Sequence, residues 1–412
     1  MAFSRADPMR VLVTVNQFES HFRGLVTLVD AISRHGHDVR VAAPEKWGAW
    51  LRGNYGVETV GVGMRWADRE FDAAIFGLLL DRDIDAFDRM YMTEFLGDRI
   101  ALRVAEDVLS LSERWRPDVV LHECSEFGGY LAAEVLGIPH VTVDIGPLQL
   151  VRDLHEDLIR PALSTQRAKL GLPEEPSTPG ILRHLTVSLT PEEFNNADVD
   201  TPLVRYRHEP PVRHNDQLLP DVFTSMPGDR PIVYLSLGSI GPFSPRFRDR
   251  MAEIYGEVFA ALAELRCTAV ISLPSLYQDI FRSLPPHIHV LPYVPQSLVL
   301  ANVDLFITHG GLNSMRDTIT YGVPHVVLPF FADHPGNARR CETLGTGIHI
   351  DPMTVTASEV YTACRLTLDD PAYLRAARAL KRHMWALPPQ SAFAYDLRDL
   401  VLSSHREKQN ER

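Results

Sequence analysis

Residues 303–322 are expected to form a strand, a tight turn and a helix in immediate succession. Their first part, 305–308, is an apolar run typical of a buried strand, and it is followed directly by His309, Gly310 and Gly311. The next helix is expected to end at Gly322, because a glycine after the last turn and a proline soon after it stop a helix. Strand–helix alternation of this kind predicts an α/β fold with parallel sheets.

The turn at 309–311 has the properties of a phosphate-binding site. Its glycines let the backbone approach a ligand closely, and the new helix directs unpaired N–H groups and its positive dipole end at that ligand. His309 adds a hydrogen-bond donor, and Ser314 in the first helical turn adds a hydroxyl group. A plain tight turn in which His309 caps the backbone fits these residues equally well.

The length, charge and cysteine content of the chain limit the classes of protein to which it can belong. The 412 residues suggest two domains, and the formal net charge of −12 argues against a nucleic-acid partner, which needs a basic face. We find no apolar stretch long enough to span a membrane and no apolar signal segment at the N-terminus. The four cysteines show no CxxC spacing, so we expect reduced thiols in a cytoplasmic protein.

The N-terminal part begins with a predicted β–α–β unit. A strand is expected over 10–15 and another over 38–43, with a helix between them that begins at Ser20 as its N-cap. His21 therefore lies at the carboxyl end of the first strand, where open parallel sheets bind their ligands. This position makes His21 a candidate general base, although a surface histidine at a helix start would look the same.

The strand expected at 118–121 brings further polar residues to the same sheet edge. Glu123 and Glu126 follow it, and a carboxylate beside an imidazole can fix the tautomer of the ring and stabilise its charged form. We expect Glu123 to be the partner of His21, with Glu126 as the other candidate. Either glutamate could instead cap the next helix. The sequence around them lacks the second histidine of HExxH, so a zinc protease is not indicated.

Two further motifs suggest other chemistry and are set aside. Asp81 and Asp83 follow an apolar run, as in transferases that bind a metal beside a diphosphate, but a solvated acidic helix start explains them better because the phosphate site lies elsewhere. The glycines at 61 and 63 lack the third glycine of a dinucleotide fingerprint, so NAD is not expected. We predict no bound metal and no cofactor.

A stretch rich in proline and polar residues, 190–231, predicts the end of one domain and a linker. A new β–α pattern starts at 232–237 and is followed by Ser239, whose hydroxyl group could also contact phosphate. Near the end of the chain, two prolines at 388–389 separate the last helix from the helices before it. We expect this last helix to cross back to the first domain.

The loop after the strand expected at 325–328 carries two more candidates. A Pro-Gly pair forces a loop there, which presents Asp333 and His334 at the sheet edge that also carries His309. A carboxylate at this place can accept hydrogen bonds from sugar hydroxyl groups. The alternative is that Asp333 caps the helix that begins at Asn337.

The order of the motifs over 291–350 resembles the family 1 glycosyltransferases, the UDP-glycosyltransferase-like branch. The stretches that carry the resemblance are VPQ, THGGLNS, YGVP, PFFADHPGNA and LGTG. It implies the GT-B fold, in which two Rossmann-like domains with parallel sheets face each other across a cleft. The acceptor-binding domain would span 1–215, with the C-terminal helix at about 388–412 packed on it, and the nucleotide-sugar-binding domain would span 216–387.

The same resemblance implies roles for individual residues. His21 would be the general base, and Glu123 its acidic partner. The donor contacts fall into three groups: the diphosphate contacts are Ser239, His309, Gly310, Gly311, Asn313 and Ser314; the nucleoside contacts are Val294, Gln296 and Asp317; the donor-sugar contacts are Asp333 and His334. The family usually has Asp–Gln where this chain has Asp333–His334, and usually Asp where this chain has Glu123.

The resemblance further implies an inverting, metal-independent transfer of a hexose-type sugar. The donor would be a UDP- or TDP-linked sugar, acting as co-substrate, and the acceptor a hydroxyl group of a small hydrophobic natural product, as in antibiotic biosynthesis. Asp317 slightly favours a ribose with both hydroxyl groups. Two alternatives stay open: a sugar-nucleotide epimerase with the same fold, and a non-catalytic auxiliary protein. The acceptor and the oligomeric state, including a homodimer, are also open.

Overall fold

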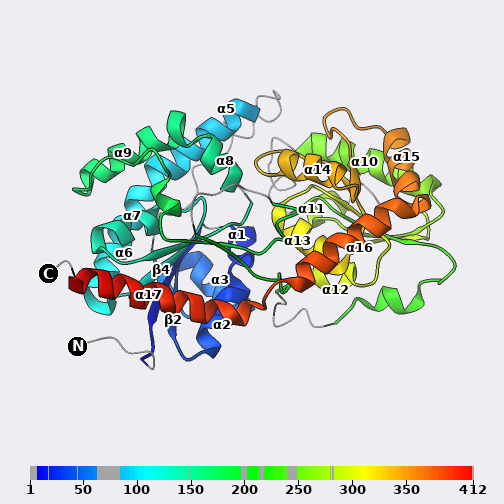
Figure 1. Cartoon of the computed structure of the whole chain (residues 1–412). Coiled ribbons are helices and arrows are strands. Elements are labelled where there is room, and N and C mark those ends of the chain that lie inside the picture. Colours follow the sequence, from blue (N-terminus) through cyan, green and yellow to red (C-terminus); the bar gives the residue numbers. More distant parts are fainter. Residues whose placement is uncertain are drawn as a thin grey trace.

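The computed structural model describes residues 7–410, apart from 17, 44, 63–83, 147, 196–201, 212, 214–217, 239–247, 279 and 281–282. In this part of the chain the strands form one sheet of seven and one sheet of six. All strand pairs in both sheets are parallel. Figure 1 shows the two sheets side by side, each with helices against it. The predicted α/β class with two parallel sheets is confirmed.

The first sheet has the strand order β3-β2-β1-β4-β5-β6-β7. Its strands are β1 (Arg10–Thr14), β2 (Asp38–Ala43), β3 (Thr59–Gly61), β4 (Val119–Glu123), β5 (His140–Val143), β6 (Leu185–Ser188) and β7 (Leu203–Arg205). The order reverses between β1 and β4, which lie side by side. In a doubly wound sheet this reversal opens a crevice at the carboxyl ends of the strands, where ligands bind.

The helices of this half pack on the sheet or on one another. They are α1 (Glu19–Arg23), α2 (Val26–Arg34), α3 (Glu45–Tyr55), α5 (Ile84–Arg89), α6 (Ala101–Trp115), α7 (Phe127–Leu136), α8 (Leu148–Asp153) and α9 (Arg160–Lys169), with π-helical turns at η1 (Met90–Ile100) and η2 (His155–Ile159). The prediction that Ser20 is the N-cap of one helix was wrong. Phe18 is the N-cap of α1, and Gly24 and Leu25 separate α1 from α2.

The second sheet has the order β10-β9-β8-β11-β12-β13 and the same kind of reversal, between β8 and β11. Its strands are β8 (Ile232–Ser236), β9 (Thr268–Ser272), β10 (Ile288–Leu291), β11 (Leu305–Thr308), β12 (His325–Val327) and β13 (Gly347–His349). Its helices are α10 (Arg248–Glu264), α11 (Ser275–Gln278), α12 (Gln296–Leu300), α13 (Leu312–Tyr321), α14 (His334–Thr343), α15 (Ala357–Asp369) and α16 (Pro371–Ala386).

The strand, turn and helix predicted over 303–322 are present as β11, a glycine turn and α13. Every residue of β11 is buried, as its apolar composition requires. Gly322 follows α13 in the left-handed conformation, with φ of 71° and its N–H bonded to the carbonyl of Thr318. Only glycine adopts this conformation without strain, which explains why the helix ends there.

The last helix, α17 (Phe393–Asn410), packs against α2. In Figure 1 it is the red helix that runs from the second sheet across the first. Tyr206, just after β7, donates a hydrogen bond to Asp396, and the ring of Tyr395 lies 5.3 Å from that of His35. The contact that the sequence predicted for the tail is therefore present, while the exact limits of the two domains stay a prediction.

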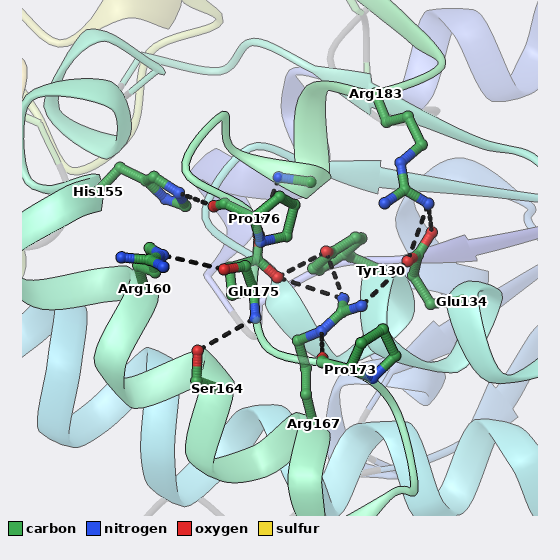
Figure 2. Close-up of polar contacts among 11 residues, drawn as sticks. Tyr130, Glu134, His155, Arg160, Ser164, Arg167, Pro173, Glu175, Pro176 and Arg183 are labelled. Carbon is green, nitrogen blue, oxygen red and sulfur yellow. Dashed lines mark hydrogen bonds and ion pairs between the residues drawn. The ribbon is translucent and has the colours of Figure 1, made fainter.

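A buried charge network fixes α9 and the chain that follows it against α7 (Figure 2). Arg167 is almost fully buried and donates to the carboxylates of Glu175, at 3.2 Å, and Glu134, at 3.3 Å. The same guanidinium group donates to the hydroxyl of Tyr130 at 2.7 Å and to the carbonyl of Pro173 at 2.6 Å. Each of the three guanidinium nitrogens thus has at least one acceptor, and the two carboxylates compensate the buried charge.

Three histidines of the first sheet lie next to one another: His122 and His140 are buried on the neighbouring strands β4 and β5, and the half-buried His184 lies just before β6. Nε2 of His122 lies 3.1 Å from Nδ1 of His140, and the rings of His140 and His184 are 4.5 Å apart. Burial lowers the pKa of His122 to about 4 and that of His140 well below its usual value. These rings are therefore neutral in the folded protein near neutral pH.

Acid should destabilise the protein through these rings. Between pH 6.5 and 4 the unfolded chain takes up a proton at His122 that the folded chain does not, so the free energy of unfolding falls as the pH falls. At ~1.4 kcal/mol per pKa unit, His122 alone contributes a loss of roughly 2 kcal/mol on going to pH 5. Urea unfolding at pH 7 and pH 5 measures this loss. His122→Gln should reduce it, whereas the exposed His35→Gln should not.

Candidate active site

The candidate residues gather at the two points where the strand order reverses. His21 follows β1, and Glu123 ends β4, so both lie at the reversal of the first sheet. His309 follows β11 at the reversal of the second sheet, next to β8. The parallel-strand topology therefore presents one group of polar side chains from each half of the chain.

His21 and Glu123 are in direct contact. Nδ1 of the His21 ring lies 2.8 Å from Oε1 of Glu123, whose side chain is fully buried. An imidazole that donates its Nδ1 proton to a carboxylate has Nε2 as the nitrogen that can accept another proton. The geometry expected of a general base and its orienting acid is thus present, and the catalytic roles themselves stay a prediction.

The longer side chain of glutamate is held in place by three further donors. Asn16 donates to Oε1 of Glu123 at 2.7 Å, and Oε2 accepts from the backbone N–H of Ser125 at 2.6 Å and from its hydroxyl at 2.7 Å. Burial alone would raise the pKa of Glu123, but the charge of His21 and these hydrogen bonds lower it. Glu123 is therefore ionised and fixed in orientation.

Glu126 does not contact His21 but caps a helix. Of the two candidate glutamates, Glu123 is therefore the one in contact with His21. The side chain of Glu126 caps α7 by accepting from the N–H groups of Gly128, at 2.7 Å, and Gly129, at 2.9 Å. It also accepts from the hydroxyl of Thr14. Burial raises the pKa of Glu126 to about 7. The helix-cap alternative considered for the two residues is correct for Glu126.

The turn between β11 and α13 brings two histidine rings onto the glycine backbone. Gly310 has a φ of 85°, and a β-carbon there would lie 2.7 Å from Cγ1 of Val327. A β-carbon on Gly311 would lie 2.6 Å from Nε2 of His309 and 3.4 Å from Nε2 of His334. Both positions therefore need glycine. The Nε2 atoms of His309 and His334 therefore lie close to the backbone of Gly311, at the start of α13.

His309 and His334 are neutral in this arrangement. Their rings are perpendicular, with centroids 4.7 Å apart. Burial lowers the pKa of His309 to about 4, and burial together with His309 lowers the pKa of His334 well below its usual value. In the unliganded protein His309 can therefore offer a hydrogen-bond donor to an anion, but it carries no charge of its own at neutral pH.

Asp333 occupies the N-cap position of α14, but its side chain makes no capping bond there and contacts the start of α13. Its Oδ2 accepts from the N–H of Leu312, the first residue of α13, at 2.9 Å and from the side chain of Asn337 at 2.8 Å. The alternative that Asp333 caps the following helix is right about its position and wrong about the start of the helix, since α14 begins at His334 and not at Asn337 and Asp333 is its N-cap residue without a side-chain bond. Burial raises the pKa of Asp333 to about 6. The sugar-binding role of Asp333 and His334 stays a prediction.

Asp317 is fully buried and has three partners. Its Oδ2 accepts from Arg23 of α1 and from Gln296 of α12, each at 2.8 Å, and its Oδ1 lies 2.8 Å from Nε2 of His208. Burial alone would raise the pKa of Asp317, but the charge of Arg23 and the bonds with His208 and Gln296 lower it. In this arrangement Asp317 has no exposed oxygen for a ribose, so its predicted contact with ribose hydroxyl groups has no geometric support here.

Sequence reasoning missed Tyr293, the residue just before the predicted nucleoside contacts. Val294 itself is buried in a hydrophobic cluster of the second sheet, whereas Tyr293 is 45% exposed. Tyr293 and Gln296 line a small cavity together with Glu19, Arg23, Tyr55, Pro211, Arg213, Pro295 and Ser297. An aromatic residue next to a Val-Pro-Gln turn was the available signal, because exposed rings provide stacking surfaces.

Helix α13 also connects the two halves of the chain, which the sequence did not reveal. Asn313 donates to the carbonyl of Ser20 at 2.6 Å, so the residue next to His21 touches the first turn of α13. Arg316, fully buried, donates to the carbonyl of Asp144 after β5. Together with the ion pair between Arg23 and Asp317, these contacts place one face of α13 directly on the loops of the first sheet.

Some predicted features lie outside the described residues. Ser239, a predicted diphosphate contact, is one of them, and so are Asp81, Asp83 and Gly63. Among the residues that the structure does describe, no group of three or more His, Cys, Asp or Glu side chains is placed to hold a metal ion. In the same part of the chain no helix has the length and apolar character needed to cross a membrane.

The chain is similar in sequence to known sugar-transferring proteins. Residues 256–400 match the family described as "Erythromycin biosynthesis protein CIII-like, C-terminal domain". The chain is 27% identical to 10-deoxymethynolide desosaminyltransferase of Streptomyces venezuelae, over 97% of this chain and 98% of the relative. It is also 27% identical to TDP-daunosamine transferase DnrS of Streptomyces peucetius, over the same shares.

Solved structures share the architecture. The glycosyltransferase VinC in complex with DTDP superposes with a TM-score of 0.77 at 22% identity, covering 95% of this chain and 99% of that one. Spinosyn forosaminyltransferase SpnP superposes with a TM-score of 0.76 at 23% identity, covering 96% and 100%. At these identities the likeness establishes the shared fold of two Rossmann-like domains.

Proposed function

Because the chain belongs to the family 1 glycosyltransferases with the GT-B fold, the type that glycosylates bacterial natural products, we propose that it transfers a sugar from a nucleoside diphosphate to a hydroxyl group of a small hydrophobic natural product. The observation that supports this most directly is the contact between Asn313 and Ser20. It joins the first turn of α13, suited to a diphosphate, to the residue beside His21. The proposed base and the proposed leaving-group site are therefore brought close to each other by this contact.

In the proposed reaction His21 acts as general base. Its Nε2 takes the proton of the acceptor hydroxyl while that oxygen forms a bond to the anomeric carbon of the donor sugar. The bond from the anomeric carbon to the diphosphate oxygen breaks on the opposite face, so the anomeric configuration is inverted. Glu123, which accepts the Nδ1 proton at 2.8 Å, stabilises the imidazolium ion that forms.

The leaving diphosphate gains negative charge, and the glycine turn is suited to stabilise it. Backbone N–H groups at the start of α13 and the positive end of its dipole favour an anion, and His309 and Ser314 add neutral donors. We propose the same turn as the diphosphate site, with Gly310, Gly311 and Asn313. Ser239 remains part of this proposal from the sequence alone.

The donor nucleotide is proposed to be TDP-linked, with UDP as the alternative. One relative that spans nearly the same length is named as a TDP-daunosamine transferase, and one solved structure of the same fold holds DTDP. We propose the exposed ring of Tyr293 as the stacking surface for the base and Gln296 as a polar contact beside it. No metal ion is required in this proposal, because helix α13 and neutral donors stabilise the leaving group.

An assay with purified protein tests the proposal. The protein is incubated with TDP-linked and UDP-linked sugars, with and without a panel of hydroxylated macrolide and polycyclic aromatic acceptors, and products are followed by mass spectrometry. A transferase releases the nucleoside diphosphate only when an acceptor is glycosylated. An epimerase would interconvert the donor sugars without acceptor. A non-catalytic auxiliary protein would bind nucleotide but turn over no donor with any acceptor.

Replacing His309 by alanine should weaken binding of the nucleoside diphosphate. A hydrogen bond to a charged group contributes about 1.5–3 kcal/mol, so the dissociation constant should rise by roughly 10- to 100-fold. Isothermal titration calorimetry with TDP and with UDP measures it. His349→Ala, at an exposed position at the end of β13, is the matched control and should leave the affinity unchanged. Equal affinities for the two variants would remove His309 from the diphosphate site.

A further inference from the structure

We propose that the ion pair between Arg23 and Asp317 positions the proposed base, His21. This inference rests on the proposed function, because it concerns the base of that reaction. It makes Arg23 and Asp317 positioning residues, which act through His21 and touch no reacting atom. Asp317, which the sequence suggested as a ribose contact, then serves the proton transfer on the opposite side of the reaction.

His21 lies in the middle of α1, a helix too short to hold itself in place. The helix has five residues, and helices of this length are unstable in water without tertiary contacts. Its N-cap residue, Phe18, forms no side-chain cap, while burial of Phe22 fixes which face of the helix points inward. The direction of α1, and with it the place of the His21 backbone, therefore depends on the groups that hold its two ends.

Helix α13 holds both of these ends. Asn313 donates to the carbonyl of Ser20, just before His21, at 2.6 Å. Nη2 of Arg23, the last residue of α1, donates to Oδ2 of Asp317 at 2.8 Å. Asn313 and Asp317 are four positions apart, about one turn, so they lie on the same face of α13. Two contacts on either side of His21 fix the direction of α1 more closely than one contact could.

Asp317 is itself held rigidly enough to act as an anchor. Its side chain is 1% exposed, and it accepts from Gln296 at 2.8 Å and lies 2.8 Å from Nε2 of His208. Burial alone would raise its pKa, but the charge of Arg23 and the bonds with His208 and Gln296 lower it, so the carboxylate is ionised. Exposed ion pairs are mobile and weak, whereas this one has a fixed, buried partner.

The chain at the end of α1 is packed directly on α13. A β-carbon on Gly24, the residue after Arg23, would lie 2.8 Å from Cγ2 of Ile145 and 3.2 Å from Nη1 of Arg316 on α13. Gly24 therefore permits a close approach that a larger residue would prevent. Arg23 reaches Asp317 across a tightly packed junction, so the ion pair can transmit the position of α13 to α1.

The imidazole ring of His21 is thereby fixed from two sides. Glu123 of the first sheet holds Nδ1 at 2.8 Å, and the two contacts of α13 hold the helix that carries the ring. With both anchors in place, Nε2 has one direction. A misplacement of about 1 Å at a reacting group can slow turnover by about 100-fold. Because α13 is also the proposed diphosphate site, the ion pair links the position of the base to that of the leaving group.

Single variants test turnover and nucleotide binding separately, with the donor and acceptor that the wild-type protein converts best. Arg23→Met and Asp317→Asn should each lower kcat by about 10- to 100-fold. In calorimetry the dissociation constants of TDP and UDP should stay within about threefold of the wild-type values, because neither residue is proposed to touch the nucleotide. Arg23→Lys keeps the charge and a donor, so it should retain more turnover than Arg23→Met.

A matched control removes an arginine of similar setting but without a link to α13. Arg34 pairs with Asp30 on α2, and its side chain is 77% exposed. Arg34→Met should leave both kcat and the nucleotide affinities at their wild-type values. Thermal unfolding of every variant shows whether it is folded at the temperature of the assay.

A double-mutant cycle tests whether Arg23 and Asp317 act as one unit. Either single change already breaks the ion pair, so the variant with both Arg23→Met and Asp317→Asn should be within about threefold of the slower single variant. Independent roles would multiply the two losses. The double variant also removes both charges, so it leaves no buried carboxylate uncompensated and keeps the test valid if Arg23→Met alone fails to fold.

The outcomes distinguish this inference from the proposed function. Wild-type turnover in Arg23→Met and Asp317→Asn, or losses that multiply in the double variant, would overturn the inference while the transferase activity remains. Weaker TDP and UDP binding in Asp317→Asn, with unchanged binding in Arg23→Met, would assign Asp317 to the nucleotide and would also overturn it. If the wild-type protein transfers no sugar, the proposed function fails and this inference fails with it.

Discussion

His21→Ala is expected to slow turnover by ~10²–10⁴, the usual effect of removing a positioned general base. The dissociation constant of the nucleoside diphosphate should stay within about twofold, because that ligand is proposed to bind at the α13 turn and not at the imidazole. The physical reason is that the contact of His21 with Glu123, at 2.8 Å, orients the imidazole ring so that Nε2 can accept the proton of the acceptor. An alanine side chain has no group that can accept this proton. Steady-state kinetics with the best donor and acceptor, together with calorimetry, measures both quantities.

A matched control is available for this experiment. His35 is an exposed histidine at the end of α2, and His35→Ala should leave turnover near the wild-type value. Glu123→Gln, which keeps the size of the side chain but removes its charge, should also reduce turnover without weakening nucleotide binding. Normal turnover in the His21 variant would reject its assignment as the base, and lost nucleotide affinity would indicate a binding role in its place.

Arg167→Met should destabilise the protein by about 3–5 kcal/mol, the usual cost of breaking a buried ion pair by removing one partner. The carboxylates of Glu175 and Glu134 would lose the charge that compensates them in a site where Arg167 is almost fully buried. Figure 2 shows how the one guanidinium group lies between both glutamates and Tyr130. Urea unfolding followed by circular dichroism measures the free energy of unfolding.

Arg103→Met serves as the comparison for that measurement. Arg103 pairs with Asp107 on α6, but its side chain is 55% exposed, and exposed pairs contribute about 0–1 kcal/mol. The two variants remove the same charge and the same length of side chain. The difference between their losses in the free energy of unfolding therefore reports the effect of burial. A loss below about 1 kcal/mol for Arg167→Met would show that the network does not stabilise the fold in the way its burial suggests.

The second half of the chain shows how far local sequence determines structure. The apolar run of β11, the glycine turn and the end of α13 at Gly322 were all predicted from residues within about twenty positions of one another. Such features depend on backbone conformation and on which residues avoid water, and both act over a few neighbours. The family resemblance rests on the same motifs, and for this reason it could be stated before any fold was known.

The start of the first half shows where local reasoning failed. Ser20 looks like a helix cap, yet α1 begins at Glu19, and Gly24 ends it. A β-carbon on Gly24 would lie 2.8 Å from Ile145 and 3.2 Å from Arg316, a residue 292 positions later in the chain. No pattern around Ser20 contains this contact, because it exists only once α13 lies on the loops of the first sheet.

The sequence by itself determined the two parallel sheets, the glycine turn and the set of polar residues at the sheet edges, since strand and helix periodicity are local. Only the tertiary structure decided which partner each of these residues takes. Glu123 contacts His21 while Glu126 caps α7, Asp333 accepts from the N–H of Leu312, and Asp317 pairs with Arg23. A carboxylate binds whichever donors the folded chain brings within about 3 Å, and those donors come from positions that are distant in the sequence.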